Sequence, residues 1–161
     1  MQFFVSSSFS KNFSLYGERV GALSIITASK EEAARVGSQV KRVIRTNYSN
    51  PPTHGGVIVA AVLGSQELRA VWEEELAGMR NRIRDMRSNL ADALKAEGVV
   101  KDFSFIAKQR GMFSFTGLTK EQVEQLQVKF GIYAVSSGRI NVAALNSKNL
   151  PVVAKAIAAV L

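Results

Sequence analysis

The chain has 161 residues, with 21 lysines and arginines against 13 aspartates and glutamates, one histidine, no cysteine and a formal net charge of +8. Its length predicts one ordinary domain or two small ones. Its 47% hydrophobic content is typical of a folded chain. The lack of cysteine excludes disulfides, a thiol nucleophile and a cysteine zinc site, and a single histidine leads us to expect no metal site.

The first half of the sequence is predicted to alternate between strands and helices. Phe3–Phe9 reads as a short strand and Arg19–Ala28 as a second, mostly apolar strand buried on both faces. Ser29-Lys30-Glu31-Glu32 fits the capping box that starts a helix. This helix is expected to end near Tyr48, because Pro51-Pro52 cannot continue it.

A short apolar helix, Val57–Leu63, is predicted to follow His54-Gly55-Gly56, with the histidine capping or packing locally. Ser65 then caps a long helix whose apolar residues recur every three or four positions as far as Leu94. About 30 residues at 1.5 Å each span roughly 45 Å, which is longer than one small core. We therefore expect this helix to connect two domains, residues 1–80 and 81–161.

The remainder alternates again, so the predicted fold class is α/β. Trp72 and the methionines of the long helix are assigned to the core, and the charged run Arg80–Arg87 to a solvated helix face. The expected elements are strands at Phe103–Ile106, Met112–Phe115, Ile132–Ser136 and Arg139–Leu145, and helices from Thr119 to Phe130 and from Asn146 or Ser147 to Leu161.

The segment with the clearest chemical content is SFSKNFSLYGERVG, residues 8–21. Lys11 follows a predicted strand end, and a lysine amine is a nucleophile only when deprotonated, a state that burial and nearby positive charge favour. Ser8 and Arg19 offer a hydroxyl and a guanidinium, groups that bind phosphate. Taken alone, these residues favour a solvated lysine in a serine-rich loop.

This segment resembles the pyridoxal-phosphate attachment motif of the class I (fold type I) aminotransferases. That motif has a small residue, an apolar or aromatic residue, a serine-like residue and a lysine. An arginine follows eight positions after the lysine, then an apolar residue and glycine or alanine. Three downstream segments resemble the aspartate and aromatic amino acid subgroup in the same order: RTNYSNPP (45–52), RGMFSFTG (110–117) and SSGRINVA (136–143).

The resemblance covers essentially the whole chain and begins one short strand before the lysine. It implies the C-terminal portion of the pyridoxal-phosphate-dependent transferase fold. Residues 1–80 would be the end of the large cofactor domain and the start of the long interdomain helix. Residues 81–161 would be the small α/β domain. We expect such a fragment to be inactive alone and to expose apolar strand edges.

The resemblance also assigns roles to the residues near the lysine. Lys11 resembles the lysine that forms a Schiff base with pyridoxal 5′-phosphate and then shuttles a proton as a general acid and base. Arg19 and Ser8 resemble ligands of the cofactor phosphate, and Ser10, beside the lysine, is expected to add a contact to the cofactor. No cofactor other than pyridoxal phosphate is implied.

Substrate-binding residues follow from the downstream segments. Arg139 resembles the arginine that binds the substrate α-carboxylate, and Phe113 an aromatic wall near it. Arg45 resembles the arginine that reaches across a homodimer interface to the distal carboxylate of aspartate or glutamate, with Asn47 and Ser49 lining the same entrance. Without the resemblance, Arg45 reads as structural, Arg139 as part of a surface ion pair and Phe113 as a core residue.

The implied function is transfer of an amino group between aspartate or an aromatic amino acid and 2-oxoglutarate. Another fold-type I reaction, such as β-elimination, is an alternative, as is a basic nucleic-acid-binding module suggested by the net charge. The cations are scattered without a binding motif, so we expect no nucleic-acid partner. No stretch reaches the roughly 18 apolar residues of a membrane span, and we expect a cytoplasmic protein without a membrane partner.

Overall fold

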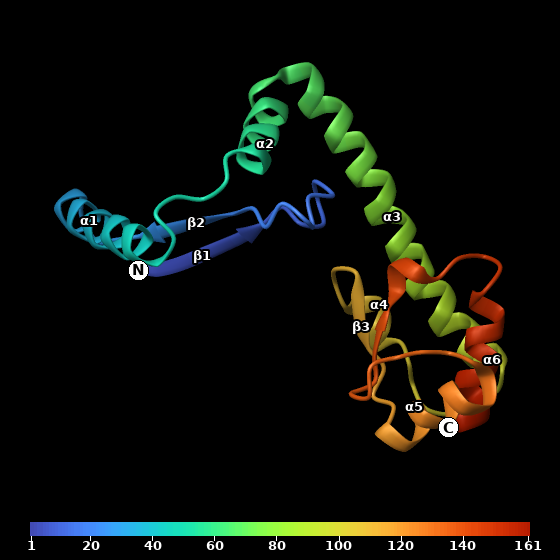
Figure 1. Cartoon of the computed structure of the whole chain (residues 1–161). Helices are drawn as coiled ribbons and strands as arrows, with labels where there is room; N and C mark the ends of the chain where they lie inside the picture. The colour runs from blue at the N-terminus through green and yellow to red at the C-terminus, as the bar shows by residue number, and fades with distance from the viewer. The chain divides into compact units, whose positions relative to one another are not determined.

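The structure is a computed structural model that describes residues 1–161, and the chain divides into two compact units, Met1–Leu76 and Ala77–Leu161. The division falls inside one continuous helix, α3 (Gln66–Ala96) (Figure 1). The predicted long helix is therefore present, and it takes part in both units. The predicted domain boundary after residue 80 stays a prediction, close to this division.

The first unit is built on a β-hairpin. Strands β1 and β2 pair antiparallel, from Phe3 opposite Ile26 to Ser8 opposite Gly21, and residues 9–20 form the loop between them. Three helices follow the hairpin in the chain (Figure 1). The elements of this unit are β1 (Phe3–Ser8), β2 (Gly21–Ile26), α1 (Lys30–Asn47), α2 (His54–Gly64) and the beginning of α3.

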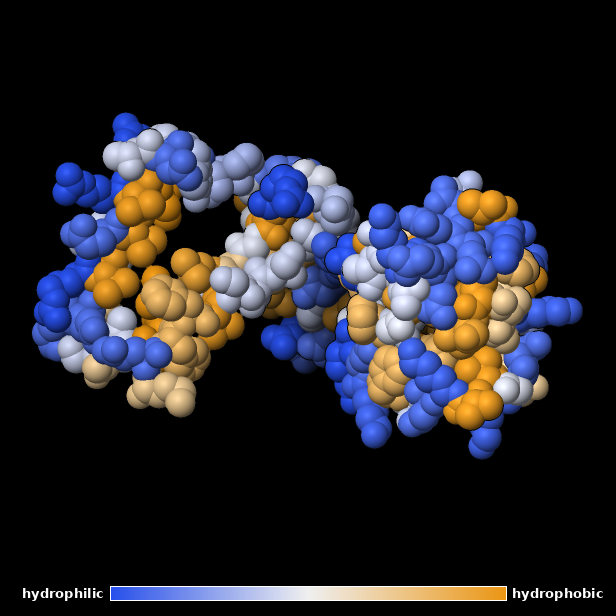
Figure 2. Space-filling view, turned by 90° about the horizontal axis from the view of Figure 1, so that it is seen from below, coloured by the Kyte–Doolittle hydropathy of each residue, from blue (hydrophilic) through white to orange (hydrophobic).

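The hairpin strands are exposed, so the expectation of a second strand buried on both faces is wrong. Phe4 is 71% exposed and Leu23 is 56% exposed. The cause is that no second layer covers the faces of this two-stranded sheet, since the only extensive contacts of the two strands are with each other. Figure 2 shows such hydrophobic side chains at the molecular surface. The expectation that the strands expose apolar side chains agrees with this arrangement.

Two helices of the first unit, α1 and α3, begin at the predicted serine caps, whereas Thr53 precedes α2 without a side-chain cap. Ser29 Oγ accepts a hydrogen bond from the Glu32 backbone N–H at 3.2 Å. The Glu32 carboxylate accepts from the Ala28 N–H at 2.7 Å, one residue earlier than in a standard capping box. Ser65 Oγ accepts from the Leu68 N–H at 3.3 Å at the start of α3. These bonds satisfy donors that the first helical turn leaves free.

The second unit packs helices around one hydrophobic core. Leu90 and Leu94 of α3, Leu126 and Ile157 are each at most 1% exposed. Strands β3 and β4 pair antiparallel beside this core. The elements are the rest of α3, α4 (Phe105–Lys108), β3 (Phe113–Phe115), α5 (Lys120–Phe130), β4 (Arg139–Asn141), the 3₁₀ helix η1 (Val142–Ala144) and α6 (Leu150–Val160).

Three of the predicted strands in this unit are wrong in type or length. The Asp102 carboxylate accepts bonds from the Ser104 N–H (2.8 Å) and hydroxyl (2.9 Å), and the chain then enters helix α4 where a strand was expected. Residues 132–136 form no strand. Strand β4 ends at Asn141, whose side chain accepts from the Ala143 N–H at 3.1 Å and starts η1. Local side-chain caps override the apolar pattern in two of these places.

The apolar stripe of α3 is buried only toward its C-terminal end. Val71 is 53% exposed and Met79 is 45% exposed. Trp72 is half-buried, so the assignment of Trp72 and Met79 to the core is wrong, whereas Met86 packs against the core of the second unit as expected. The charged run is not wholly solvated either, because Arg87 is only 2% exposed.

Candidate functional site

The predicted cofactor residues lie in the hairpin loop of the first unit, Phe9–Val20, called the lysine loop below. The Phe9 N–H donates to the Val20 carbonyl at 3.2 Å, which closes the base of the loop. The Ser10 N–H donates to Ser8 Oγ at 3.3 Å, and Ser10 is 8% exposed. Lys11 itself is exposed. The loop thus gathers two hydroxyls and an accessible primary amine at the end of β1.

Both cations of the lysine loop lie near one aromatic ring. Lys11 Nζ is 4.6 Å from the centroid of the Tyr16 ring, and Arg19 Cζ is 5.8 Å from it. Arg19 Nη1 donates to the Tyr16 carbonyl at 3.2 Å. Neither Lys11 nor Arg19 takes part in an ion pair. The one acid of the loop, Glu18, faces His54 instead, so neither cation has a carboxylate partner, an arrangement that suits an anionic ligand.

Helix α3 holds the N-terminal part of the lysine loop. Trp72 Nε1 donates to the Asn12 carbonyl at 2.7 Å. The Trp72 indole stacks on Phe13 with ring centroids 4.6 Å apart, and Phe13 meets Phe9 edge-on at 5.4 Å. The sequence assigned Trp72 to the core alone and missed this contact, since nothing in the periodicity of α3 predicts an indole N–H aimed at a distant carbonyl.

Arg45 and Ser49 contact each other at the end of α1. Arg45 Nη1 donates to Ser49 Oγ at 2.6 Å. Ser49 has a left-handed backbone with φ 71°, which brings its side chain back over the last helical turn. Arg45 is exposed and forms no ion pair, so its guanidinium is held by a neutral group and its charge stays uncompensated.

Arg139 and Phe113 meet on the two-stranded sheet of the second unit. Arg139 lies opposite Phe115 on the neighbouring strand, and its Cζ lies 4.9 Å from the centroid of the Phe113 ring, in the range of a cation–π contact. Phe113 is 44% exposed and Arg139 has no carboxylate partner. Reading Phe113 as a core residue and Arg139 as half of a surface ion pair is therefore wrong.

A buried threonine fixes the turn before Arg139. The Thr116 hydroxyl and N–H donate to the Gly138 carbonyl at 2.7 Å and 3.0 Å. Gly138 has φ 80°, and a Cβ there would lie 2.7 Å from the Leu118 carbonyl oxygen. Only glycine fits this close approach, which sets where β4 begins.

Arg87 fixes the start of β3 from inside the core. Its guanidinium donates to the carbonyls of Gly111 (2.6 Å), Phe113 (2.9 Å) and Ile106 (3.5 Å). Burial, with a smaller contribution from the Arg110 charge, lowers the pKa of Arg87. The sequence contained one signal for this residue: it precedes the buried Leu90 and Leu94 at helical spacing.

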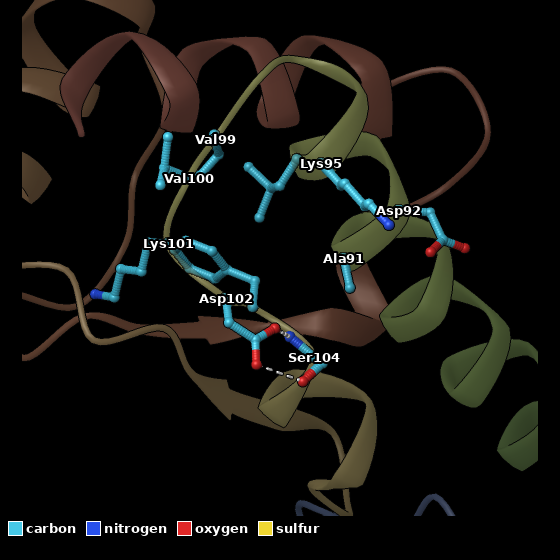
Figure 3. Close-up of a pocket in the computed structure, with 10 residues that line it drawn as sticks. Ala91, Asp92, Lys95, Val99, Val100, Lys101, Asp102 and Ser104 are labelled. Atoms are coloured by element: carbon cyan, nitrogen blue, oxygen red, sulfur yellow. Dashed lines mark hydrogen bonds between the residues drawn. The ribbon is translucent and has the colours of Figure 1, made fainter.

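A pocket of about 390 Å³ in the second unit does not include any predicted site residue (Figure 3). Lys95 and Lys101 point in opposite directions, and Asp102 is bonded to Ser104, whose N–H and hydroxyl lower the pKa of Asp102. The polar side chains do not converge on one point, so this pocket is not the candidate site.

Comparisons with known proteins cover nearly the whole chain. Residues 1–157 match the family described as "Aminotransferase class I and II". An "Aspartate aminotransferase" of Pseudomonas aeruginosa is 67% identical over 161 residues, which are 100% of this chain and 40% of that protein. An "Aromatic-amino-acid aminotransferase" of Escherichia coli is 50% identical over 157 residues, 98% of this chain and 40% of that protein.

Solved structures give the same result. The aromatic-amino-acid aminotransferase of Burkholderia pseudomallei, described as covalently bound to pyridoxal phosphate, has a TM-score of 0.95 and 73% identity over 100% of this chain and 40% of that chain. A mitochondrial aspartate aminotransferase of Trypanosoma brucei has a TM-score of 0.93 and 48% identity over 99% of this chain and 42% of that chain. The predicted fold class is confirmed, and the chain spans about two fifths of the length of these proteins.

No helix combines the length and hydrophobicity needed to cross a membrane.

Proposed function

The chain belongs to the class I and II aminotransferases, and from this we propose that it supplies the cofactor-binding loop and the carboxylate-binding arginines of such an enzyme. The proposed reaction moves an amino group between aspartate or an aromatic amino acid and 2-oxoglutarate. The observation that carries the proposal is the lysine loop, which gathers Ser8, Ser10, Lys11 and Arg19 and leaves both cations without an ion pair.

The residues of the lysine loop fit pyridoxal phosphate. Lys11 offers a primary amine for the aldehyde, and Arg19 with Ser8 and Ser10 offers a guanidinium and hydroxyls for the phosphate. Because neither cation is paired with a carboxylate, a phosphate group displaces no internal anion. When bound, the cofactor supplies an electron sink for the electrons of the substrate Cα–H bond. The relative described as bound to pyridoxal phosphate supports this choice.

Lys11 and Arg139 divide the work on the substrate. The Lys11 amine would accept the proton that leaves the substrate Cα and pass it on to the cofactor, which is general acid–base catalysis. The planar guanidinium of Arg139 binds the α-carboxylate by two parallel hydrogen bonds, and the Phe113 ring supports the guanidinium from one side. Holding the carboxylate fixes the direction of the Cα–H bond, which lowers the entropic cost of proton removal.

Arg45 is proposed as the group that selects dicarboxylates. Ser49 orients its guanidinium through the 2.6 Å hydrogen bond, and the charge stays free for a distal carboxylate. The relatives named for aspartate and for aromatic amino acids support both substrate classes. We further propose that the whole enzyme is a homodimer in which Arg45 serves the partner's site, and that it works in the cytoplasm.

The deciding experiment is to add pyridoxal phosphate, reduce with borohydride and map the labelled peptide. Label on Lys11 is expected, with loss of label in Lys11→Ala and retention in the control Lys41→Ala, a change at an exposed lysine of α1. Label distributed over many lysines would contradict the proposal. In the full-length enzyme, Arg45→Ala should reduce kcat/KM for aspartate at least about tenfold more than for phenylalanine, since a charge-assisted bond is worth about 1.5–3 kcal/mol.

A further inference from the structure

The beginning of α2 packs directly on the C-terminal side of the lysine loop. His54 Nδ1 lies 3.0 Å from Glu18 Oε2. Gly55 is buried, and a Cβ built there would lie 2.9 Å from the Glu18 Cβ and 3.1 Å from the Val20 Cγ1. These contacts reach the residues immediately before and after Arg19 and skip Arg19 itself.

The Arg19 backbone needs such support. Its φ is 54°, in the left-handed region that is sterically unfavourable for a non-glycine residue. A backbone of this kind persists only where its surroundings fix it. Within the loop, Arg19 has the bond from its side chain to the Tyr16 carbonyl, and Val20 accepts from the Phe9 N–H at 3.2 Å. The Glu18 N–H also donates to the Leu15 carbonyl at 3.2 Å. A further constraint comes from α2.

We propose that His54, Glu18 and Gly55 are positioning residues that hold Arg19 in its left-handed conformation, ready to bind the cofactor phosphate. This inference rests on the proposed function, because it assigns the phosphate to Arg19. Lys11 depends on a different anchor, since the bond from Trp72 to the Asn12 carbonyl lies on its side of the loop. Loosening the α2 contact therefore weakens phosphate binding and leaves attachment at Lys11 largely intact.

The test compares two aldehydes in the full-length protein that carries these residues. Pyridoxal phosphate and pyridoxal both react with the lysine amine, and only the first has a phosphate. Dissociation constants from the absorbance change on binding are measured for wild type, His54→Ala, Glu18→Ala and the control Glu73→Gln, which breaks the exposed 2.8 Å ion pair of Arg69 and Glu73 on α3.

We expect His54→Ala and Glu18→Ala to weaken pyridoxal phosphate binding by up to about fivefold, the upper end of the range for an exposed ion pair, and to leave pyridoxal binding unchanged. Glu18→Ala also sets two effects against each other. Removing an acid next to Arg19 raises the local positive potential and would by itself tighten phosphate binding. Weaker binding therefore supports positioning. Glu73→Gln should change neither constant, and His54→Gln, which keeps a donor for Glu18, should restore most of the affinity.

Three outcomes would overturn the inference: equal weakening for both aldehydes, no change for either, or tighter phosphate binding in Glu18→Ala. Circular dichroism checks that each variant is folded, and if His54→Ala is not, Glu18→Ala and His54→Gln decide. A wild-type protein that attaches no pyridoxal phosphate to Lys11 would contradict the proposed function instead. The wild-type measurement and the variant ratios thus separate the two failures.

Discussion

Replacing Arg87 by methionine tests whether a buried guanidinium sets the position of β3. The side chain is 2% exposed and donates two short bonds, 2.6 Å to the Gly111 carbonyl and 2.9 Å to the Phe113 carbonyl. Methionine keeps much of the apolar stem and removes every donor. A hydrogen bond from a charged donor is worth about 1.5 kcal/mol at the low end, so losing two should cost about 3 kcal/mol.

Amide hydrogen exchange followed by mass spectrometry is the suitable assay, because the only tryptophan, Trp72, lies in the other unit and does not report on β3. Peptides covering β3 and β4 should exchange about 100-fold faster in Arg87→Met, the ratio that corresponds to about 3 kcal/mol. The matched control is Arg84→Met, a side chain 66% exposed whose ion-pair partner is its neighbour Asp85. It should change exchange by less than about threefold. If Arg87→Met behaves like Arg84→Met, the two carbonyls do not depend on the guanidinium and the reasoning fails.

Three further outcomes are expected. Gly138→Ala should destabilise the second unit by about 2–4 kcal/mol more than Gly98→Ala in the same exchange assay, because both have φ 80° and only the former brings a Cβ within 2.7 Å of an oxygen, that of Leu118. Ser104→Ala should raise the pKa of Asp102 in an NMR titration. Since these bonds lower that pKa, their contribution to stability is present above the unfolded pKa of about 3.9 and is lost as the pH falls through the folded value. The purified 161-residue chain should show no transamination of aspartate and 2-oxoglutarate, because it spans 40% of the matched aspartate aminotransferase; rapid turnover would contradict this.

Helix positions could be predicted from the sequence because their signals are local. Ser29 caps α1 and Thr119 caps α5 with a complete capping box, as the serine and threonine patterns indicated. The segment Phe103–Ile106 forms no strand, and the sequence did not reveal this because four residues are too few to distinguish a strand period from a helix period. The Asp102 carboxylate accepts hydrogen bonds from the Ser104 backbone and side chain, and the chain then enters helix α4.

The candidate site shows the same division between local and long-range signals. The order of serines, lysine and arginine in the lysine loop is a local pattern. It can therefore be compared directly with the motif of a known family. The contacts that hold the loop join residues far apart in the chain, such as Trp72 to Asn12 and His54 to Glu18. A single sequence does not specify such pairs, because each partner alone has an ordinary local explanation.

The net charge of +8 is distributed unevenly between the two units, which the overall composition does not reveal. Residues 1–76 hold eight lysines and arginines and seven acids, whereas residues 77–161 hold thirteen and six. Within the second unit, Arg82, Arg87, Lys101 and Arg110 donate to backbone carbonyls.

Cations used in this way satisfy main-chain acceptors and need no external anion. Much of the excess charge is therefore part of how this unit holds its turns together, which weakens the argument from charge to a nucleic-acid partner. The cations that we propose to bind ligands are few and have no carboxylate partner: Lys11, Arg19 and Arg45 in the first unit and Arg139 in the second. Among these four, only Arg19 has a left-handed backbone.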